Sequence, residues 1–174
     1  MRFLLCLMVL ILPLASVRAE ESDLDRAMAD SIALFEAVYP TLGQTLAGVD
    51  LAAYRDALSL QRFRSSYWGG EITLRISSTP EAGGDCSRFA AYTRIPPENG
   101  AVRLVLCPEF FTTGADALRR LTILHEMVHV VSGPDECRAM AFAAAVEGAG
   151  LGSYTPVDSY WAANGCANGP FSLP

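Results

Sequence analysis

One helical segment constrains the fold of this chain more than any other feature. From about Ala115 to Val131 the apolar residues fall on two adjoining stripes of a helical surface, so most of the helix circumference is predicted to be buried. The stripes consist of Ala117, Leu121, Leu124, Val128 and Val131, and of Ile123, Met127 and Val130. A helix buried on so many sides belongs in the core of the fold.

The rest of this helix forms a narrow polar strip of Thr122, His125, Glu126 and His129. The chain contains 2 histidines, and both lie on this strip. Histidines four residues apart on a helix project to the same side and can bind one metal ion. Burying such groups without a partner is costly, and a metal ion satisfies them. The strip therefore predicts a metal site; a chance His-Glu-x-x-His pattern and a purely structural metal are the alternatives.

The same strip predicts a chemical reaction. Zinc is the expected ion, because imidazole nitrogens suit it and a catalytic zinc site keeps one position open for water. Glu126 lies beside the histidines and can take a proton from that water as it attacks a carbonyl. Passing the proton to the departing amine completes the hydrolysis of a peptide bond.

A third metal ligand is expected from the acidic pair that follows the Gly133-Pro134 turn. We favour Glu136, because it would begin the next helix, which is a rigid platform. Asp135 is the alternative ligand, and Glu147 is a more distant one. Acidic residues are also favoured at helix starts by the helix dipole, without any metal.

The N-terminus predicts an export signal over residues 1–19. Arg2 precedes an apolar run that ends at Leu14, and small residues lead to an expected cleavage site near Ala19. The apolar run is shorter than the ~20 residues that cross a bilayer, so a cleaved signal is favoured over an anchor. The mature protein, residues 20–174, is then expected to be a single periplasmic or extracellular domain and a monomer.

Cleavage would change the formal net charge from −6 to −8, because Arg2 and Arg18 are removed. An acidic domain is an improbable partner for nucleic acid. It also has no electrostatic reason to adhere to anionic membranes.

The four cysteines beyond the signal are expected to form two disulfides, as is usual in exported proteins. Cys86 and Cys107 bound two strand-like segments that flank the turn cluster 96–100, so a hairpin would place them opposite each other. Cys137 and Cys166 then form the second pair. Closely spaced cysteine pairs, which zinc binding would require, are absent from the sequence.

The remaining pattern indicates an α+β fold. Apolar spacing predicts a helix over 22–38 and a second one after the N-cap Asp50, with Phe63 as a possible buried member. Alternation predicts a strand over 71–77, and an Ala-rich helix is expected over 136–148. Beyond Gly150 we expect irregular structure. The two N-terminal helices either belong to the mature domain or form a short pro-segment.

From Cys86 to about Phe142 the sequence resembles the zincin metallopeptidases, in particular the aspzincin group of deuterolysin and peptidyl-lysine metalloendopeptidase. The likeness rests on the strand ending in 104–108, on Phe110-Phe111 and on the pattern from His125 to His129. It implies a helical N-terminal part, a small mostly antiparallel sheet and two active-site helices. It also implies a cleft beside the sheet edge, where an extended peptide substrate pairs with the edge strand.

The sequence departs from this family at two points. The segment 133–136 replaces a Gly-Thr-x-Asp motif, with Glu136 where the family has aspartate, which is similar to gluzincins. The family's transition-state tyrosine has no counterpart at Ala139 or Met140. Tyr154 and Tyr160 are candidates to replace it, although surface or packing roles are the simpler expectation for both. Two alternatives therefore stay open: an inactive zincin that serves as an exported binding module, and a metallohydrolase of a non-protein amide.

Overall fold

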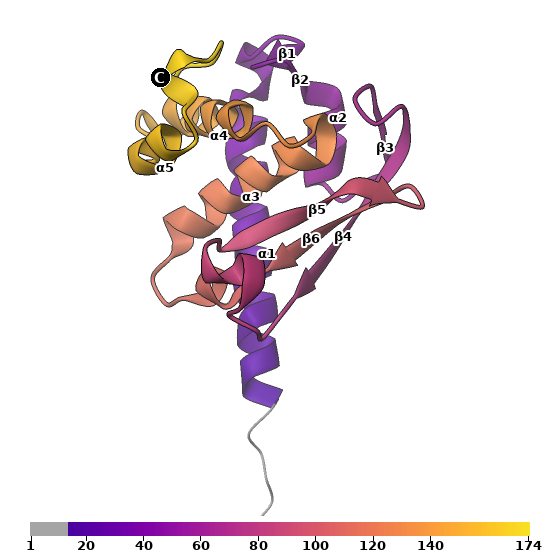
Figure 1. The fold of residues 1–174 in the computed structure, drawn as a ribbon, viewed down its shortest axis with the longest axis vertical. Coiled ribbons are helices and arrows are strands. Elements are labelled where there is room, and N and C mark those ends of the chain that lie inside the picture. Colours follow the sequence, from indigo (N-terminus) through magenta and orange to yellow (C-terminus); the bar gives the residue numbers. More distant parts are fainter. Residues whose placement is uncertain (1–13) are drawn as a thin grey trace, which may run out of the picture.

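The computed structural model describes residues 14–174 and shows an α+β fold with two disulfides (Figure 1). The helices are α1 (Leu14–Val38), α2 (Leu51–Leu58), α3 (Asp116–Ser132), α4 (Glu136–Leu151) and α5 (Asp158–Ala163). The main sheet contains β3 (Phe63–Ser65), β4 (Gly70–Ser78), β5 (Ala91–Glu98) and β6 (Ala101–Leu106). A separate two-stranded ribbon pairs β1 (Thr45–Leu46) with β2 (Val49–Asp50).

The predicted helices are present, with boundaries that differ by a few residues in most cases. Asp50 caps α2 by accepting hydrogen bonds from the amides of Ala52 and Ala53, as its sequence position predicted. The helix ends at Leu58, and Leu60 adopts a positive φ of 57°. Phe63 consequently lies in β3 and not on the helix, which corrects the prediction.

The sheet is mixed, whereas a mostly antiparallel one was predicted. Its strand order is β3-β4-β6-β5, and the central pair β4-β6 is parallel while the two outer pairs are antiparallel. The chain leaves β4, skips one position to form β5 at the edge, and returns as β6 between them. This return makes β6 run in the same direction as β4.

The hairpin turn lies further along the sequence than the start of the predicted turn cluster 96–100. Pro96 and Pro97 belong to β5, and Asn99 and Gly100 form the turn with φ values of 51° and 72°. Asparagine and glycine tolerate these left-handed conformations. Cys86 lies in a short 3₁₀ helix and not in a strand.

Both predicted disulfides, Cys86–Cys107 and Cys137–Cys166, are confirmed. Their presence is consistent with an extracellular location. The C-terminal region contains α5 and a short 3₁₀ helix ending at Asn168, where irregular structure was expected.

The predicted core helix α3 lies in the centre of the molecule (Figure 1). Its buried apolar residues are Leu121, Ile123, Leu124, Met127, Val128, Val130 and Val131. Ala117, predicted to be buried, is exposed near the start of the helix. Arg119, on a different side of the same helix turn, is buried and donates hydrogen bonds to the carbonyls of Phe110 and Thr112.

The N-terminal helices share this core. Phe35 of α1 and Phe142 of α4 both contact Tyr54 of α2, with ring centroids 4.8 and 4.4 Å from the tyrosine ring. The hydroxyl of Tyr54 donates a hydrogen bond of 2.9 Å to the carbonyl of Leu124 in α3. Removing α1 or α2 would therefore expose the apolar surface around α3 and α4.

Most of the expected export signal lies outside the described residues. Helix α1 begins at Leu14, so the expected cleavage point near Ala19 falls in its first turns. Among the helices of residues 14–174, none is both long and apolar enough to cross a membrane.

Candidate metal centre

Helix α3 places the two histidines one turn apart on the same side. His129 is buried and His125 is partly buried, and their Nε2 atoms lie 3.1 Å apart. The i and i+4 positions lie on one helix face, so this approach follows from the local sequence. Both rings therefore present a nitrogen to the same point.

Glu136 reaches that point from the start of α4. The chain leaves α3 through Gly133, whose φ of 85° only glycine adopts readily, and turns back. The Oε2 atom of Glu136 lies 3.0 Å from Nε2 of His125 and 3.5 Å from Nε2 of His129. One ligand atom from each of the three residues lies within 4.8 Å of the others, so the group could hold a metal ion. Two imidazole nitrogens and one carboxylate oxygen are ligand types that zinc commonly takes.

A backbone carbonyl fixes the orientation of His129. Its Nδ1 atom lies 2.8 Å from the carbonyl oxygen of Gly133. Because a carbonyl only accepts hydrogen bonds, Nδ1 carries a proton in either charge state of the ring. In the neutral ring the lone pair of Nε2 faces the other two residues, and in the protonated ring Nε2 can donate to Glu136. Metal-binding histidines commonly have such a partner on the second ring nitrogen.

The electrostatics of the three groups favour a bound cation. Burial alone raises the pKa of Glu136, but hydrogen bonds to His125 and His129 outweigh it and lower the pKa well below the usual value. Burial lowers the pKa of His129, and this effect is exceeded by the hydrogen bond to Glu136 and the charge of Glu126, so the pKa is raised. The carboxylates thus stabilise positive charge between the rings.

Glu126 lies beside this group in a different environment. Its side chain is buried, and burial raises its pKa despite the opposing effect of His125 and His129. The hydroxyl of Thr93 in β5 donates a hydrogen bond of 2.5 Å to Oε2 of Glu126. A carboxylate with a raised pKa next to a metal group is suited to accepting and releasing a proton.

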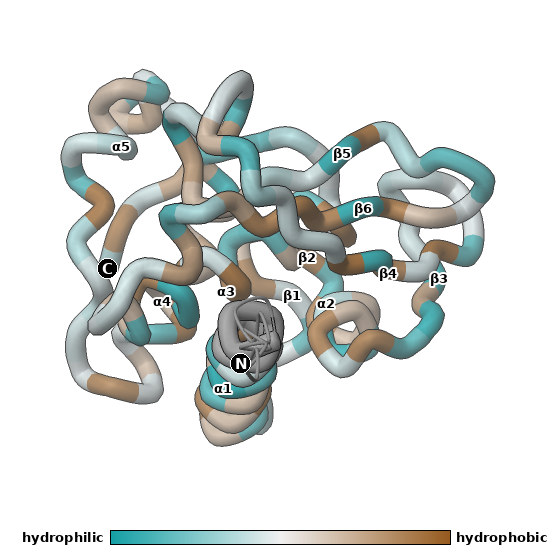
Figure 2. Tube along the Cα trace, turned by 90° about the horizontal axis from the view of Figure 1, so that it is seen from below, coloured by the Kyte–Doolittle hydropathy of each residue, from teal (hydrophilic) through white to brown (hydrophobic). Residues whose placement is uncertain are grey.

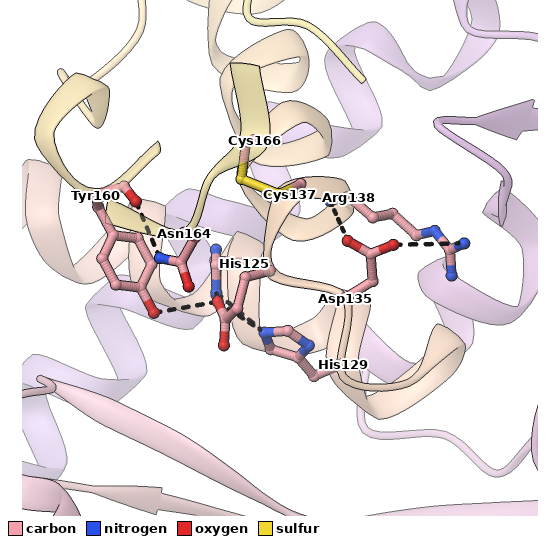
Figure 3. The surroundings of a disulfide bond; sticks show 9 residues. His125, His129, Asp135, Cys137, Arg138, Tyr160, Asn164 and Cys166 are labelled. Carbon is pink, nitrogen blue, oxygen red and sulfur yellow. Dashed lines mark hydrogen bonds and ion pairs between the residues drawn. A yellow bond between two sulfur atoms is a disulfide. The ribbon is translucent and has the colours of Figure 1, made fainter. Parts of the chain in front are cut away.

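Tyr160 of α5 also reaches the site, although the sequence favoured a surface or packing role for this residue. Its hydroxyl donates a hydrogen bond of 3.2 Å to Oε2 of Glu136 (Figure 3). Burial and the charge of Glu136 raise the pKa of Tyr160, so the phenol stays protonated. The Cys137–Cys166 disulfide joins the residue next to Glu136 to the segment just after α5 (Figure 3). The predicted pairing of Cys137 with Cys166 was therefore a sequence signal that the segment containing Tyr160 lies near Glu136.

The other two acidic candidates have structural roles. Asp135 caps α4 by accepting a hydrogen bond of 3.0 Å from the amide of Arg138, so its carboxylate is not part of the metal group. Glu147 is fully buried, and its carboxylate lies 3.1 Å from Nε of Arg120 and accepts a hydrogen bond from the amide of Thr155. Tyr154, the second tyrosine candidate, packs partly buried against the core.

Two hollows adjoin the metal group. The first, with a volume of about 220 Å³, extends along β5 and is lined by Ala91, Thr93, Ile95, Glu126, His129, Pro134 and Glu136, among others. The second, of about 240 Å³, is more apolar and includes Phe89, Leu118, Leu121, Met140, Val157 and Tyr160. Glu126 and Tyr160 line both hollows and so lie where the two meet.

Replacing Gly133 with alanine is expected to lower the free energy of unfolding by about 1–3 kcal/mol, because the combination of φ 85° and ψ −167° is essentially restricted to glycine. An added Cβ would also lie 2.3 Å from the Tyr67 ring. Urea unfolding monitored by circular dichroism measures the change. Gly114→Ala is the matched control, since Gly114 also has a positive φ but nothing lies within 4 Å of an added Cβ. Equal losses in both variants would show that the Tyr67 contact has no effect.

Comparison with known proteins gives no relative: no family model matches the chain, and no similar curated protein or solved structure was found.

Proposed function

We propose that this protein is a zinc-dependent metallopeptidase of the zincin type. The observation that carries the proposal is the convergence of His125, His129 and Glu136 on one point, with the buried carboxylate of Glu126 beside them. The donor set suits zinc. A structural zinc site would instead be closed by four protein ligands, and the described residues offer three.

Each residue has a distinct role in the proposed reaction. His125, His129 and Glu136 would hold the ion, which supplies Lewis acidity for the substrate carbonyl and lowers the pKa of water. Glu126 accepts a proton from the attacking water as the new C–O bond forms, and Thr93 orients its carboxylate. Glu126 then gives that proton to the amine nitrogen as the C–N bond breaks.

The geometry of β5 supports an extended peptide as the substrate. The carbonyl of Ala90 accepts a hydrogen bond of 2.9 Å from the amide of Cys107, and such pairs alternate along an antiparallel ladder. The main-chain groups of Ala91 and Thr93, which lie in the regular part of the ladder, therefore point away from β6, towards the free edge. This edge borders the hollow that contains the metal group, so a substrate strand paired with β5 would pass across it.

The more apolar hollow favours a substrate with a large apolar side chain next to the cleaved bond. Its lining includes the apolar residues Leu118, Leu121 and Met140 as well as His125 and Glu126. A leucine or phenylalanine side chain placed there would leave the peptide carbonyl close to the metal group.

The test combines metal analysis with cleavage of an unbiased peptide library by the purified protein. We expect one zinc ion per chain and cleavage that stops on treatment with a chelator. A zinc-loaded protein that cleaves no peptide would contradict the proposal and favour an exported binding module. Turnover of small amides in place of peptides would favour a metallohydrolase with a non-protein substrate.

Replacing Tyr160 with phenylalanine is expected to lower metal affinity by about tenfold or more, because Glu136 loses the hydrogen bond that orients it. Competition with a coloured zinc chelator measures the affinity, and peptide cleavage is followed in parallel with saturating zinc. Tyr154→Phe is the matched control. A fall in kcat at saturating zinc would assign Tyr160 a direct contact with the substrate; unchanged zinc affinity and unchanged kcat would exclude both roles.

A further inference from the structure

A row of three arginines crosses the face of the sheet that is turned away from α3. Arg75 of β4 is paired with Arg103 of β6 in the parallel ladder, and Arg103 with Arg94 of β5 in the antiparallel ladder. Figure 2 shows these three strands side by side. All three side chains are exposed. Neighbouring strands lie about 4.8 Å apart, so this arginine row spans about 10 Å across the sheet.

No arginine of the row forms a close ion pair with a carboxylate of the described residues, although the pKa of Arg94 is raised by its hydrogen bond to Tyr92 and, to a smaller extent, by the nearby charges of Glu98 and Asp85. Seven other arginines each lie within 3.9 Å of a carboxylate oxygen, namely Arg26, Arg55, Arg62, Arg88, Arg119, Arg120 and Arg138. Among the side chains that the structure describes, no such pair involves Arg75, Arg94 or Arg103. Like charges directly opposite each other on neighbouring strands are destabilising. The row is therefore an unfavourable arrangement unless an anion offsets it.

The position of the arginine row within the sheet supports a binding role. The chain has no lysine, so the choice of arginine over lysine at these three positions carries no information. Charged residues often protect the edge of a sheet against unwanted pairing, but Arg75 and Arg103 lie on the two interior strands. The chain also has 19 acidic residues against 13 basic ones, so its overall charge would repel an anion and only a local site would attract one.

The surface around the row is hollowed. All three arginines line one hollow of about 140 Å³, together with Glu98, Asn99 and Ala101. A second hollow of about 240 Å³ is lined by Arg94 and Arg103, by one acidic residue, Glu81, and by residues with hydroxyl groups, among them Ser77, Ser78, Thr79 and Tyr92. Glu98 reduces the charge of the first hollow but leaves it with an excess of positive groups. A hollow of this size accommodates a small anionic group and not a folded partner.

We propose that the arginine row binds a tetrahedral oxyanion, a phosphate or sulfate group, independently of the metal centre on the other face of the sheet. Each guanidinium can donate two parallel hydrogen bonds to neighbouring oxygens, so a group with several oxygens can engage two arginines at once. A carboxylate has only two oxygens and one charge. Arg103 has another guanidinium on each side and is the residue on which binding depends most.

Isothermal titration calorimetry with inorganic phosphate and with sulfate, at constant ionic strength, tests the proposal. We expect saturable binding of one anion per chain, and no saturable binding of acetate. Arg103→Gln should weaken binding by about tenfold or more. Arg64→Gln removes an exposed arginine of β3 outside the row and should change the affinity by less than about twofold.

One further variant, Glu136→Gln, and a vesicle-binding measurement distinguish the alternatives. Phosphate held by the metal centre would be lost in Glu136→Gln and retained in Arg103→Gln, which would overturn the proposal, as would the absence of saturable binding. Thermal melting of Arg103→Gln should show an unchanged or raised melting temperature, since a repulsive charge is removed. Sedimentation with phosphatidylcholine vesicles, with and without phosphatidylglycerol, distinguishes a lipid-borne phosphate from a free one.

Discussion

Replacing Glu126 with glutamine is expected to lower peptide hydrolysis by about 10²–10⁴-fold while zinc stays bound and the fold is unchanged. Glutamine has nearly the same shape as glutamate and can still accept the hydrogen bond from Thr93. It cannot take a proton from water, so only the general base is lost. The raised pKa of Glu126, caused by its burial, makes it the better proton acceptor of the two acidic residues at the site.

The measurement is the kcat for a cleaved library peptide, together with the zinc content and the melting temperature of the same preparation. Glu109→Gln removes an exposed glutamate on the same chain and should leave all three unchanged. If Glu126→Gln cleaves peptides at the normal rate, another group supplies the base and the proposed mechanism is wrong. Glu126→Asp is measured alongside, because it retains a carboxylate at this position. It should keep part of the activity. This variant tests the role of the carboxylate even if Glu126→Gln loses its zinc.

Replacing Glu136 with glutamine is expected to lower zinc affinity by more than about 100-fold. Loss of a residue that merely supports a metal ligand costs about 10–100-fold, and loss of the ligand itself should exceed this range. An amide carries no negative charge, so the attraction between Glu136 and a cation bound to His125 and His129 also disappears. Equilibrium competition with a zinc chelator measures the affinity.

Asp135→Asn is the matched control for this variant. Asparagine is a good N-cap, so it can still accept the hydrogen bond from the amide of Arg138 and preserve the start of α4. Zinc affinity should therefore change by less than about threefold. Release of zinc from Asp135→Asn together with its retention by Glu136→Gln would reverse the assignment of the third ligand.

The sequence alone was sufficient for features that depend on neighbouring residues. The period of 3.6 residues in an α-helix puts His125 and His129 on one face wherever the helix forms. The apolar stripes that bury α3 are likewise a property of one segment. The disulfide Cys86–Cys107 could be predicted because the β5-β6 hairpin brings its two ends together, although Cys86 lies in the 3₁₀ helix just before the hairpin. Even the approach of Glu136 follows from one short turn after α3.

The tertiary structure decided which distant segments complete the site. Thr93 is 33 residues from Glu126, and Tyr160 is 24 residues from Glu136, and no local pattern records that either hydroxyl reaches its carboxylate. The arginine row likewise exists only because β6 returns between β4 and β5, which sets Arg103 beside Arg75 and Arg94. Strand order depends on how the whole chain buries its apolar faces, so residues that are unremarkable in sequence become neighbours only after folding.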